Sequence, residues 1–467
     1  MERNNLWKTY KENDLAALEA LSSDYKEFLS TAKTERLCVD ESIKAAEKAG
    51  FADLDKLISE GKAIKAGDRF YRQFMNKTLI LGILGKKPLT EGMNILGAHI
   101  DSPRLDLKQN PLYENTELAY LDTHYYGGVK KYQWVTIPLA LYGVVAKKDG
   151  TLVDIAIGDG EDDPVFCITD LLIHLAGEQL QKKASVVVTG EALDLLIGSR
   201  PLAKEEGKEE EKEAVKANIL KLLLEQYHIE EEDFLSAEIE VVPAGKARDL
   251  GFDRSMIIGY GHDDRVCAYT SLRAILDSET PERTALCVLT DKEEIGSVGA
   301  TGAESHFFED TVAELLELAE GYTGIKQRRA LRNSCVLSSD VSAAFDPSYE
   351  GSFERKNTAY FGRGIAFNKY TGSRGKGGSN DANAEYLGKI RRVMDDNKVG
   401  FQTAELGKVD EGGGGTIAYI LAGYGMNVID SGVAVLCMHS PWEIVSKADV
   451  YEAYKCYKAF VKDMEMK

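Results

Sequence analysis

The chain has 467 residues, with 76 acidic and 57 basic side chains and a formal net charge of −19. This length exceeds the usual size of one hydrophobic core, so we expect two domains or one domain with a large insertion. The charge disfavours nucleic acid and anionic membranes as partners. Scattered cysteines in apolar surroundings, no apolar signal core at the start and no run long enough to span a membrane predict a cytoplasmic protein.

The first part of the chain predicts helices followed by strands. Residues 6–66 mix helical spacing with many charges, which favours two or more amphipathic helices. Strand-like runs follow at 78–82 and 93–99, and the second ends abruptly in the polar segment 99–103. A strand that leads into a polar loop is typical of the way an α/β sheet presents a site.

The middle of the chain has a different texture. Residues 109–245 contain short β-like runs divided by Gly and Asp, which predicts a separate β-rich insertion. After residue 245, apolar strands again alternate with helical segments, and 441–464 reads as a closing amphipathic helix. We therefore expect an α/β fold, with a sheet flanked by helices built from 1–108 and 246–467.

Acidic or imidazole side chains follow five apolar runs. Two divalent ions that share a site need a bridging carboxylate, terminal carboxylates and neutral imidazoles, and these five segments supply each of them once. The segments are His99-Ile100-Asp101, His262-Asp263-Asp264-Arg265, Glu293-Glu294, Ser338-Ser339-Asp340 and Met438-His439-Ser440.

Each segment also has an ordinary structural interpretation. A lone His-x-Asp is commonly a surface polar pair, but Asp101 could orient His99 through its second ring nitrogen. Asp263 or Asp264 could bridge two metals, with Arg265 offsetting their charge, or the pair could cap the following helix. Asp340 could cap a turn. The five segments together favour a metal site over these separate explanations.

The catalytic candidates lie in the same segments. Adjacent glutamates on an extended segment point in opposite directions, so Glu294 could bind a metal while Glu293 reaches the attacking water. His439 follows a strand that we expect to be buried on both faces, so its ring falls at a strand end; a core histidine bonded to backbone is its alternative.

These motifs, in this order and at these intervals, resemble the aspartyl aminopeptidase family of dinuclear zinc exopeptidases over nearly the whole chain. The resemblance implies a zinc-exopeptidase-like mixed sheet with an inserted dimerisation domain at 109–245. It also implies a tetrahedral homododecamer that acts on peptides with a free N-terminus. Zinc would be the cofactor, two ions per subunit, although cobalt or manganese can use similar ligands.

The resemblance also assigns the metal ligands. His99 and His439 would be terminal ligands, and Asp263 would bridge the two ions as the first residue of its Asp-Asp pair. Glu294 and Asp340 would complete the two coordination shells.

Three further residues receive catalytic roles from the resemblance. Glu293 would be the general base, and Asp101 would orient His99. His174 matches by context a histidine that family members bring into the site from a neighbouring subunit. A partly buried helix histidine is an equally good interpretation of His174 from the sequence.

One departure from the family concerns the choice of substrate. Members specific for acidic residues have a lysine in the strand where this chain reads Ile365-Ala366-Phe367. Arg363, Lys369 or Arg374 would have to replace that cation, so specificity for Asp or Glu stays open. A dinuclear hydrolase that acts on another bond, such as a deacylase, and a catalytically silent assembly protein are the alternative functions.

Overall fold

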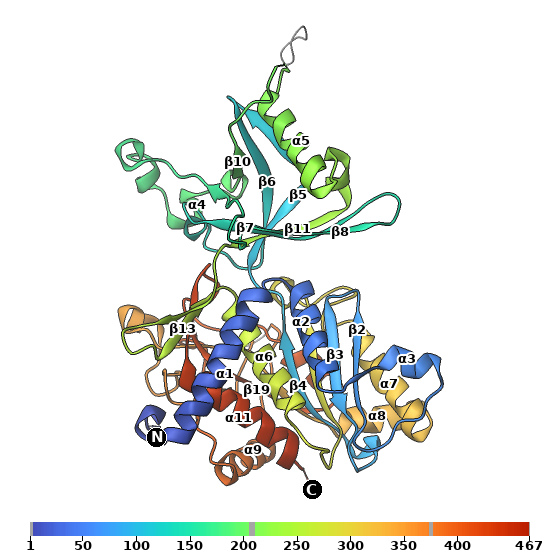
Figure 1. Cartoon of the computed structure of the whole chain (residues 1–467). Helices are drawn as coiled ribbons and strands as arrows, with labels where there is room; N and C mark the ends of the chain where they lie inside the picture. Colours follow the sequence, from blue (N-terminus) through green and yellow to red (C-terminus); the bar gives the residue numbers. More distant parts are fainter. Residues whose placement is uncertain (1–2, 205–210, 373–376, 467) are drawn as a thin grey trace. The chain divides into compact units, whose positions relative to one another are not determined.

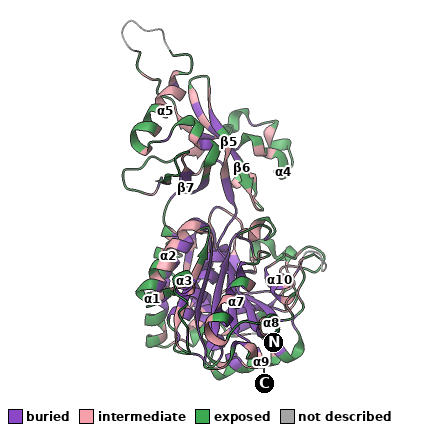
Figure 2. Cartoon of the chain, turned by 90° about the vertical axis from the view of Figure 1, so that its right-hand side faces the viewer, coloured by how far each residue is buried: buried purple, intermediate pink, exposed green. Residues whose placement is uncertain are grey.

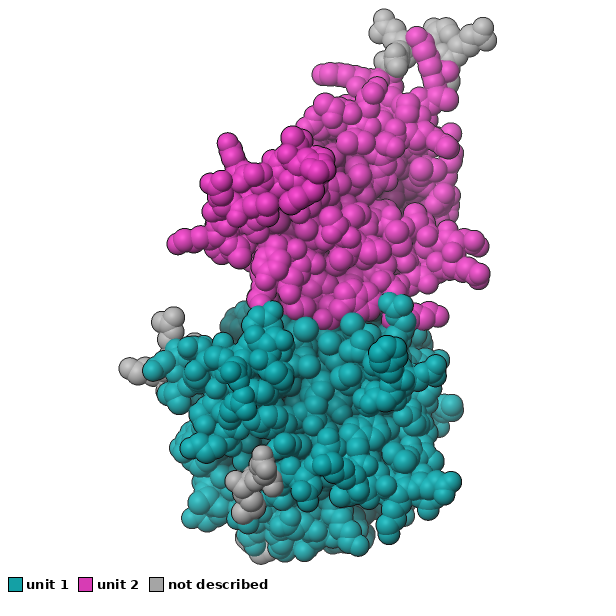
Figure 3. All heavy atoms as spheres, turned by 90° about the vertical axis from the view of Figure 1, so that its left-hand side faces the viewer, with its two compact units in different colours: residues 1–102, 247–438, 443–467 teal, residues 103–246, 439–442 magenta. Residues whose placement is uncertain are grey.

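The computed structural model describes residues 3–204, 211–372 and 377–466. The chain divides into two compact units (Figure 3). Unit 1 comprises Met1–Ser102, Ala247–Met438 and Glu443–Lys467, and unit 2 comprises Pro103–Lys246 and His439–Trp442. The catalytic role expected for residues 1–108 with 246–467 stays a prediction. The dimerisation role expected for residues 109–245 stays one as well. Within the described residues, no helix is both long and apolar enough to cross a membrane.

The main sheet of unit 1 is mixed. The central strand β4 pairs in parallel with β14 and β15, whereas β3 pairs antiparallel with β14 and β17 antiparallel with β19. The nine strands found among the described residues are, in sheet order, β1 (Ala52–Asp53), β2 (Arg69–Phe74), β3 (Thr78–Ile83), β14 (Ala285–Thr290), β4 (Asn94–His99), β15 (Cys335–Ser338), β19 (Asn427–Gly432), β17 (Ile365–Asn368) and β18 (Phe401–Ala404).

Helices cover both faces of this sheet (Figure 1). One face packs against α1 (Glu12–Thr31), α2 (Glu35–Lys48), α6 (His262–Leu276), α9 (Ala384–Asp396) and α11 (Lys447–Asp463). The other face packs against α3 (Leu54–Ser59), α7 (Phe307–Glu320), α8 (Gly324–Arg332) and α10 (Ala418–Ala422). The expected α/β fold with a helix-flanked mixed sheet is therefore confirmed.

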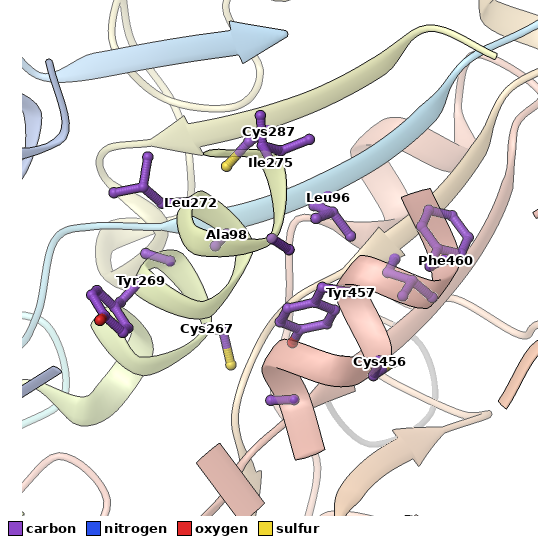
Figure 4. Close-up of a cluster of buried hydrophobic side chains, with 14 of the residues drawn as sticks. Leu96, Ala98, Cys267, Tyr269, Leu272, Ile275, Cys287, Cys456, Tyr457 and Phe460 are labelled. Carbon is purple, nitrogen blue, oxygen red and sulfur yellow. The ribbon is translucent and has the colours of Figure 1, made fainter. Parts of the chain in front are cut away.

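The alternation of side chains along each strand produces the two cores. On β4, Leu96 belongs to the core on one face and Ile95 to the core on the other, as the period of two along a strand requires. Figure 4 shows Leu96 beneath α6 and α11, with Tyr457 and Phe460 of α11 close by. Because β3, β4 and β14 are buried along their whole length, the centre of unit 1 is purple in Figure 2. The sheet is therefore a rigid base for the side chains at its strand ends.

The closing segment differs from its prediction. The single helix expected over 441–464 is wrong at its start, because Glu443–Ser446 forms strand β21 and the helix begins at Lys447. The β-branched pair Ile444-Val445 fits a pleated surface, and β21 pairs with both β13 and β20, so partners far along the chain decided its conformation. This smaller sheet of unit 1 contains β12 (Arg248–Leu250), β13 (Met256–Gly259), β21, β20 (Ala434–Leu436) and β16 (Ser342–Ala343).

Unit 2 is built on an antiparallel sheet. Its order is β8 (Leu152–Ile157), β7 (Leu139–Ala146), β11 (Ala237–Pro243), β5 (Arg104–Asn115), β6 (Leu118–Tyr126), β10 (Leu195–Gly198) and β9 (Cys167–Ile168). Helices α4 (Ala184–Val187) and α5 (Ala214–Tyr227) accompany it. The sequence therefore correctly indicated that this part of the chain is rich in short strands.

Gly364, directly before β17, cannot carry a side chain without strain. Its φ is +90°, and a Cβ atom there would lie 2.0 Å from the carbonyl oxygen of Gly400. We expect Gly364→Ala to lower the free energy of unfolding by about 2–4 kcal/mol. In urea unfolding, the control Gly388→Ala should raise it by about 0.5–1 kcal/mol, because Gly388 lies within α9 with nothing within 4 Å of the added atom. Equal stability of the two variants would contradict this account.

Candidate metal centre and active site

His99 is held at the end of β4 in a defined orientation. Its side chain is 2% exposed, and Nδ1 lies 3.0 Å from the main-chain oxygen of Asp101 and 3.3 Å from Asp101 Oδ1. Both neighbours only accept hydrogen bonds, so in the neutral imidazole the proton is on Nδ1. The lone pair of Nε2 then faces Asp263 Oδ1 at 3.2 Å. Burial alone would lower the pKa of His99, but the carboxylates of Asp101, Asp263 and Glu293 raise it well above its usual value.

The Asp101 carboxylate also organises the segment that carries the two glutamates. The N–H of Glu293 donates to Asp101 Oδ1 at 3.2 Å, and the N–H of Glu294 donates to Oδ2 at 3.1 Å. The extended conformation expected for this pair is wrong: Glu293–Ile295 forms a 3₁₀ turn, η8, between left-handed Lys292 (φ 68°) and Gly296 (φ 97°). The sequence carries no signal for this contact, because Asp101 is about 190 residues away.

The turn before α6 positions Asp263. Gly261 adopts φ +76°, a backbone conformation that favours glycine, and a Cβ there would lie 2.0 Å from Arg265 Nη1. Asp263 and Asp264 have non-helical backbone angles and are joined by a cis peptide bond. The Ser102 hydroxyl donates to the Asp263 carbonyl oxygen at 2.5 Å. Asp263 is thus oriented by contacts outside its own helix.

Arg265 is buried beside the two aspartates, and its suggested role in offsetting their charge stays a prediction. Its guanidinium donates to the main-chain oxygens of Lys33 and Tyr260, at 2.7 and 3.4 Å, and it is 1% exposed. Burial and the neighbouring Asp263 raise the pKa of Asp264 well above its usual value. This carboxylate is therefore costly to ionise in its surroundings.

The predicted ligands of unit 1 come together at the ends of its buried strands. One ligand atom each from His99, Asp263 and Asp340 lie within 4.8 Å of one another, and the same is true of His99, Glu293 and Glu294. Asp340 is 9% exposed, and its pKa is raised well above the usual value by burial and by Asp264. Imidazole nitrogen and carboxylate oxygens are the ligands zinc takes in proteins, and a cation would favour their ionised forms. The residues therefore fit zinc.

The two remaining predicted histidines belong to unit 2. His439 follows β20 in the segment His439–Trp442, and its Nδ1 lies 3.0 Å from the main-chain oxygen of Gly128. Its role as a zinc ligand stays a prediction. His174 lies on a 3₁₀ turn, η4 (Ile173–Leu175), and is exposed, so its interpretation as a partly buried helix histidine is wrong.

The candidate cations for an acidic substrate are engaged elsewhere. Lys369 forms an ion pair with Asp381 at 2.7 Å, and the Arg363 guanidinium lies 4.5 Å from the centre of the Tyr360 ring. Arg374 lies outside the described residues.

Sheet, strand ends and ligand cluster together define a metal-dependent hydrolase of the α/β class. The family model of aminopeptidase I zinc metalloproteases (M18) matches residues 28–461, so the chain belongs to this family. It is accordingly a zinc-dependent aminopeptidase, and neither a deacylase nor a silent assembly protein is favoured.

Similar proteins match this chain over nearly its full length. A probable M18 family aminopeptidase 1 of Clostridium acetobutylicum is 58% identical over 99% of this chain and 98% of its own. The crystal structure of aminopeptidase I from that organism is 56% identical, with a TM-score of 0.92, and covers 99% of this chain and 100% of the other. The M18 aminopeptidase of Thermotoga maritima is 45% identical, with a TM-score of 0.93 and the same coverage.

Removing the Asp101 carboxylate should release His99 and the η8 turn together. We expect Asp101→Ala to weaken zinc binding roughly 10–100-fold, the usual effect of losing a group that orients a ligand. Competition against a chromophoric chelator measures this. The control is Asp53→Ala, which removes a carboxylate that accepts a backbone N–H at the start of α3. Zinc affinity that is unchanged in Asp101→Ala would show that Asp101 does not orient the ligands.

Proposed function

We propose that the chain releases the N-terminal residue from unblocked peptides by using two zinc ions per subunit. The ligands would be His99, Asp263, Glu294, Asp340 and His439, with Asp263 bridging. One observation carries the proposal. His99, Asp263 and Asp340 lie beside the η8 turn, and one possible ligand atom from each lies within 4.8 Å of the other two. Cobalt or manganese could occupy the same oxygen and nitrogen ligands.

In the proposed reaction, Glu293 acts as the general base. Its Oε2 lies 4.0 Å from His99 Nε2, and its side chain is 15% exposed, so the carboxylate borders the ligands and remains accessible to solvent. Bound zinc supplies Lewis acidity toward water and the scissile carbonyl. Glu293 Oε2 accepts the proton of the attacking water and returns it to the nitrogen of the leaving amine. The Asp101 carboxylate supports this step by holding the backbone of Glu293.

Peptide profiling tests the function directly. Metal-stripped protein should be inactive, and zinc should restore cleavage of peptides with a free N-terminus but not of their N-acetylated copies. Each reaction is followed by release of the first amino acid. Zinc-dependent removal of the acetyl group instead would indicate a deacylase, and no turnover in any metal state would indicate a silent protein.

Replacing the base should separate chemistry from metal binding. We expect Glu293→Gln to lower kcat by about 10²–10⁴-fold, because the amide cannot accept the proton, while zinc content stays at the wild-type level. Elemental analysis and steady-state kinetics measure the two quantities on the same samples. Glu282→Gln, an exposed glutamate paired with Lys86, is the matched control. Wild-type kcat in Glu293→Gln would exclude the assignment.

We further propose that unit 2 is the dimerisation domain of a cytoplasmic homo-oligomer, a tetrahedral dodecamer as the family resemblance implies. Leu171, Leu172, Ile173 and Leu175, which surround His174, are 46%, 53%, 67% and 67% exposed. An exposed apolar run of this kind is typical of a protein interface. A second copy of the chain that covers it would also place His174 against a neighbouring subunit.

Mixing inactive variants tests the trans role of His174. We expect His174→Ala and Glu293→Gln oligomers to be inactive or weak when separate. After dissociation and reassembly together, activity should return, because sites with an intact Glu293 then receive an intact histidine from the other subunit. Light scattering checks that both variants assemble. Recovery at the additive level of the two separate variants would exclude the exchange.

We also propose that this site does not favour acidic N-terminal residues. Lys369, one of the cations that could bind a substrate carboxylate, already forms an ion pair with Asp381 at 2.7 Å. A panel of peptides that differ in their first residue tests this proposal, since neutral or basic first residues should be cleaved faster than Asp or Glu.

A further inference from the structure

The main chain of Asp263 is bonded on both of its polar groups by buried side chains. Its N–H donates to Glu443 Oε2 at 3.0 Å, and its carbonyl oxygen accepts from Ser102 Oγ at 2.5 Å. Glu443 is 1% exposed and Ser102 is fully buried. Because Asp263 has a non-helical ψ of 107°, the helix that follows does not fix the direction of this residue. Side chains from other elements fix it instead.

We infer that Glu443 is a positioning residue for the zinc site, acting through the backbone of Asp263. This inference rests on the ligand role of Asp263 in the proposed function. A carboxylate that accepts a backbone N–H makes a charge-assisted hydrogen bond, which is about twice as strong as a neutral one. With this bond in place, Asp263 presents its Oδ1 toward His99 Nε2 at 3.2 Å.

Glu443 itself is fixed by strand pairing. It is the first residue of β21, and its Cα is in register with Gly259 of β13. The chain then runs from Gly259 through Tyr260 and the left-handed Gly261 into the Asp263 turn. The acceptor therefore lies on β21, and the donor lies in the turn that follows the neighbouring strand β13, at the start of α6. A site whose supporting groups lie on rigid elements keeps its geometry better than one supported by loops.

A general stabilising role is the alternative, and the chain contains a matched control for it. Asp449 of α11 is also fully buried, and it also accepts backbone N–H groups, from Gly362 at 2.9 Å and from Gly364 at 2.7 Å. None of these three residues is a predicted zinc ligand. Asp449→Ala should therefore lower stability without a specific effect on zinc.

The experiment compares the zinc dissociation constants of full-length Glu443→Ala, Glu443→Gln and Asp449→Ala with that of the wild type. Chelator competition gives the affinity, thermal unfolding of zinc-free protein gives the stability, and cobalt absorption reports the geometry of the bound metal. We expect Glu443→Ala to weaken zinc binding roughly 10–100-fold and to alter the cobalt spectrum. Glu443→Gln, which retains an acceptor oxygen, should recover most of the affinity, and Asp449→Ala should bind zinc as the wild type does.

Wild-type zinc affinity in Glu443→Ala, or an equal loss in Asp449→Ala, would overturn the inference. If Glu443→Ala does not fold, Ser102→Ala removes the other hydrogen bond that holds the backbone of Asp263, and wild-type zinc affinity in that variant would overturn the inference equally. Failure of the proposed function would be a different result, because the wild-type protein itself would then not require zinc for cleavage.

Discussion

The site depends on the contacts that the Asp101 carboxylate makes with two separate segments of the chain. This carboxylate faces Nδ1 of His99 on one side and receives the N–H groups of Glu293 and Glu294 on the other. One buried group therefore orients His99 at the end of β4 and fixes the turn that follows β14. Since these strands are parallel neighbours, their carboxyl ends lie at the same edge of the sheet, and a single short side chain can reach both.

Charge balance is the second constraint on this arrangement. Burial raises the pKa values of Asp264 and Asp340, so the ionised forms of these carboxylates are unfavourable in the cluster by itself. The positive charge that zinc brings to this family therefore fits the structure, because the carboxylates are placed to share a cation.

Apolar runs in the sequence predicted where the strands end. Features that depend on contacts between residues far apart in the chain could not be predicted from it. His99 and Asp340 follow apolar runs whose burial can be read directly, and both lie where the sequence indicated. The conformation of Glu293 could not be read, because it depends on Asp101 and on two left-handed neighbours. The local sequence predicts helix at Glu443, because only pairing with distant strands makes it part of β21. Its contact with Asp263 had no sequence signal at all.

The position of β4 in the sheet has a consequence for how the chain is made. Its partners β14 and β15 begin at residues 285 and 335, so β4 leaves the ribosome long before either exists. At about 5–20 residues per second, the strand waits roughly 10–50 s for the second partner. During that time the nearly continuous unit 2 can form its sheet, whereas the apolar β4 stays exposed. Nascent unit 1 therefore exposes apolar strand surface for longer than unit 2, and the ends of β4, β14 and β15 can meet only after residue 335 has been made.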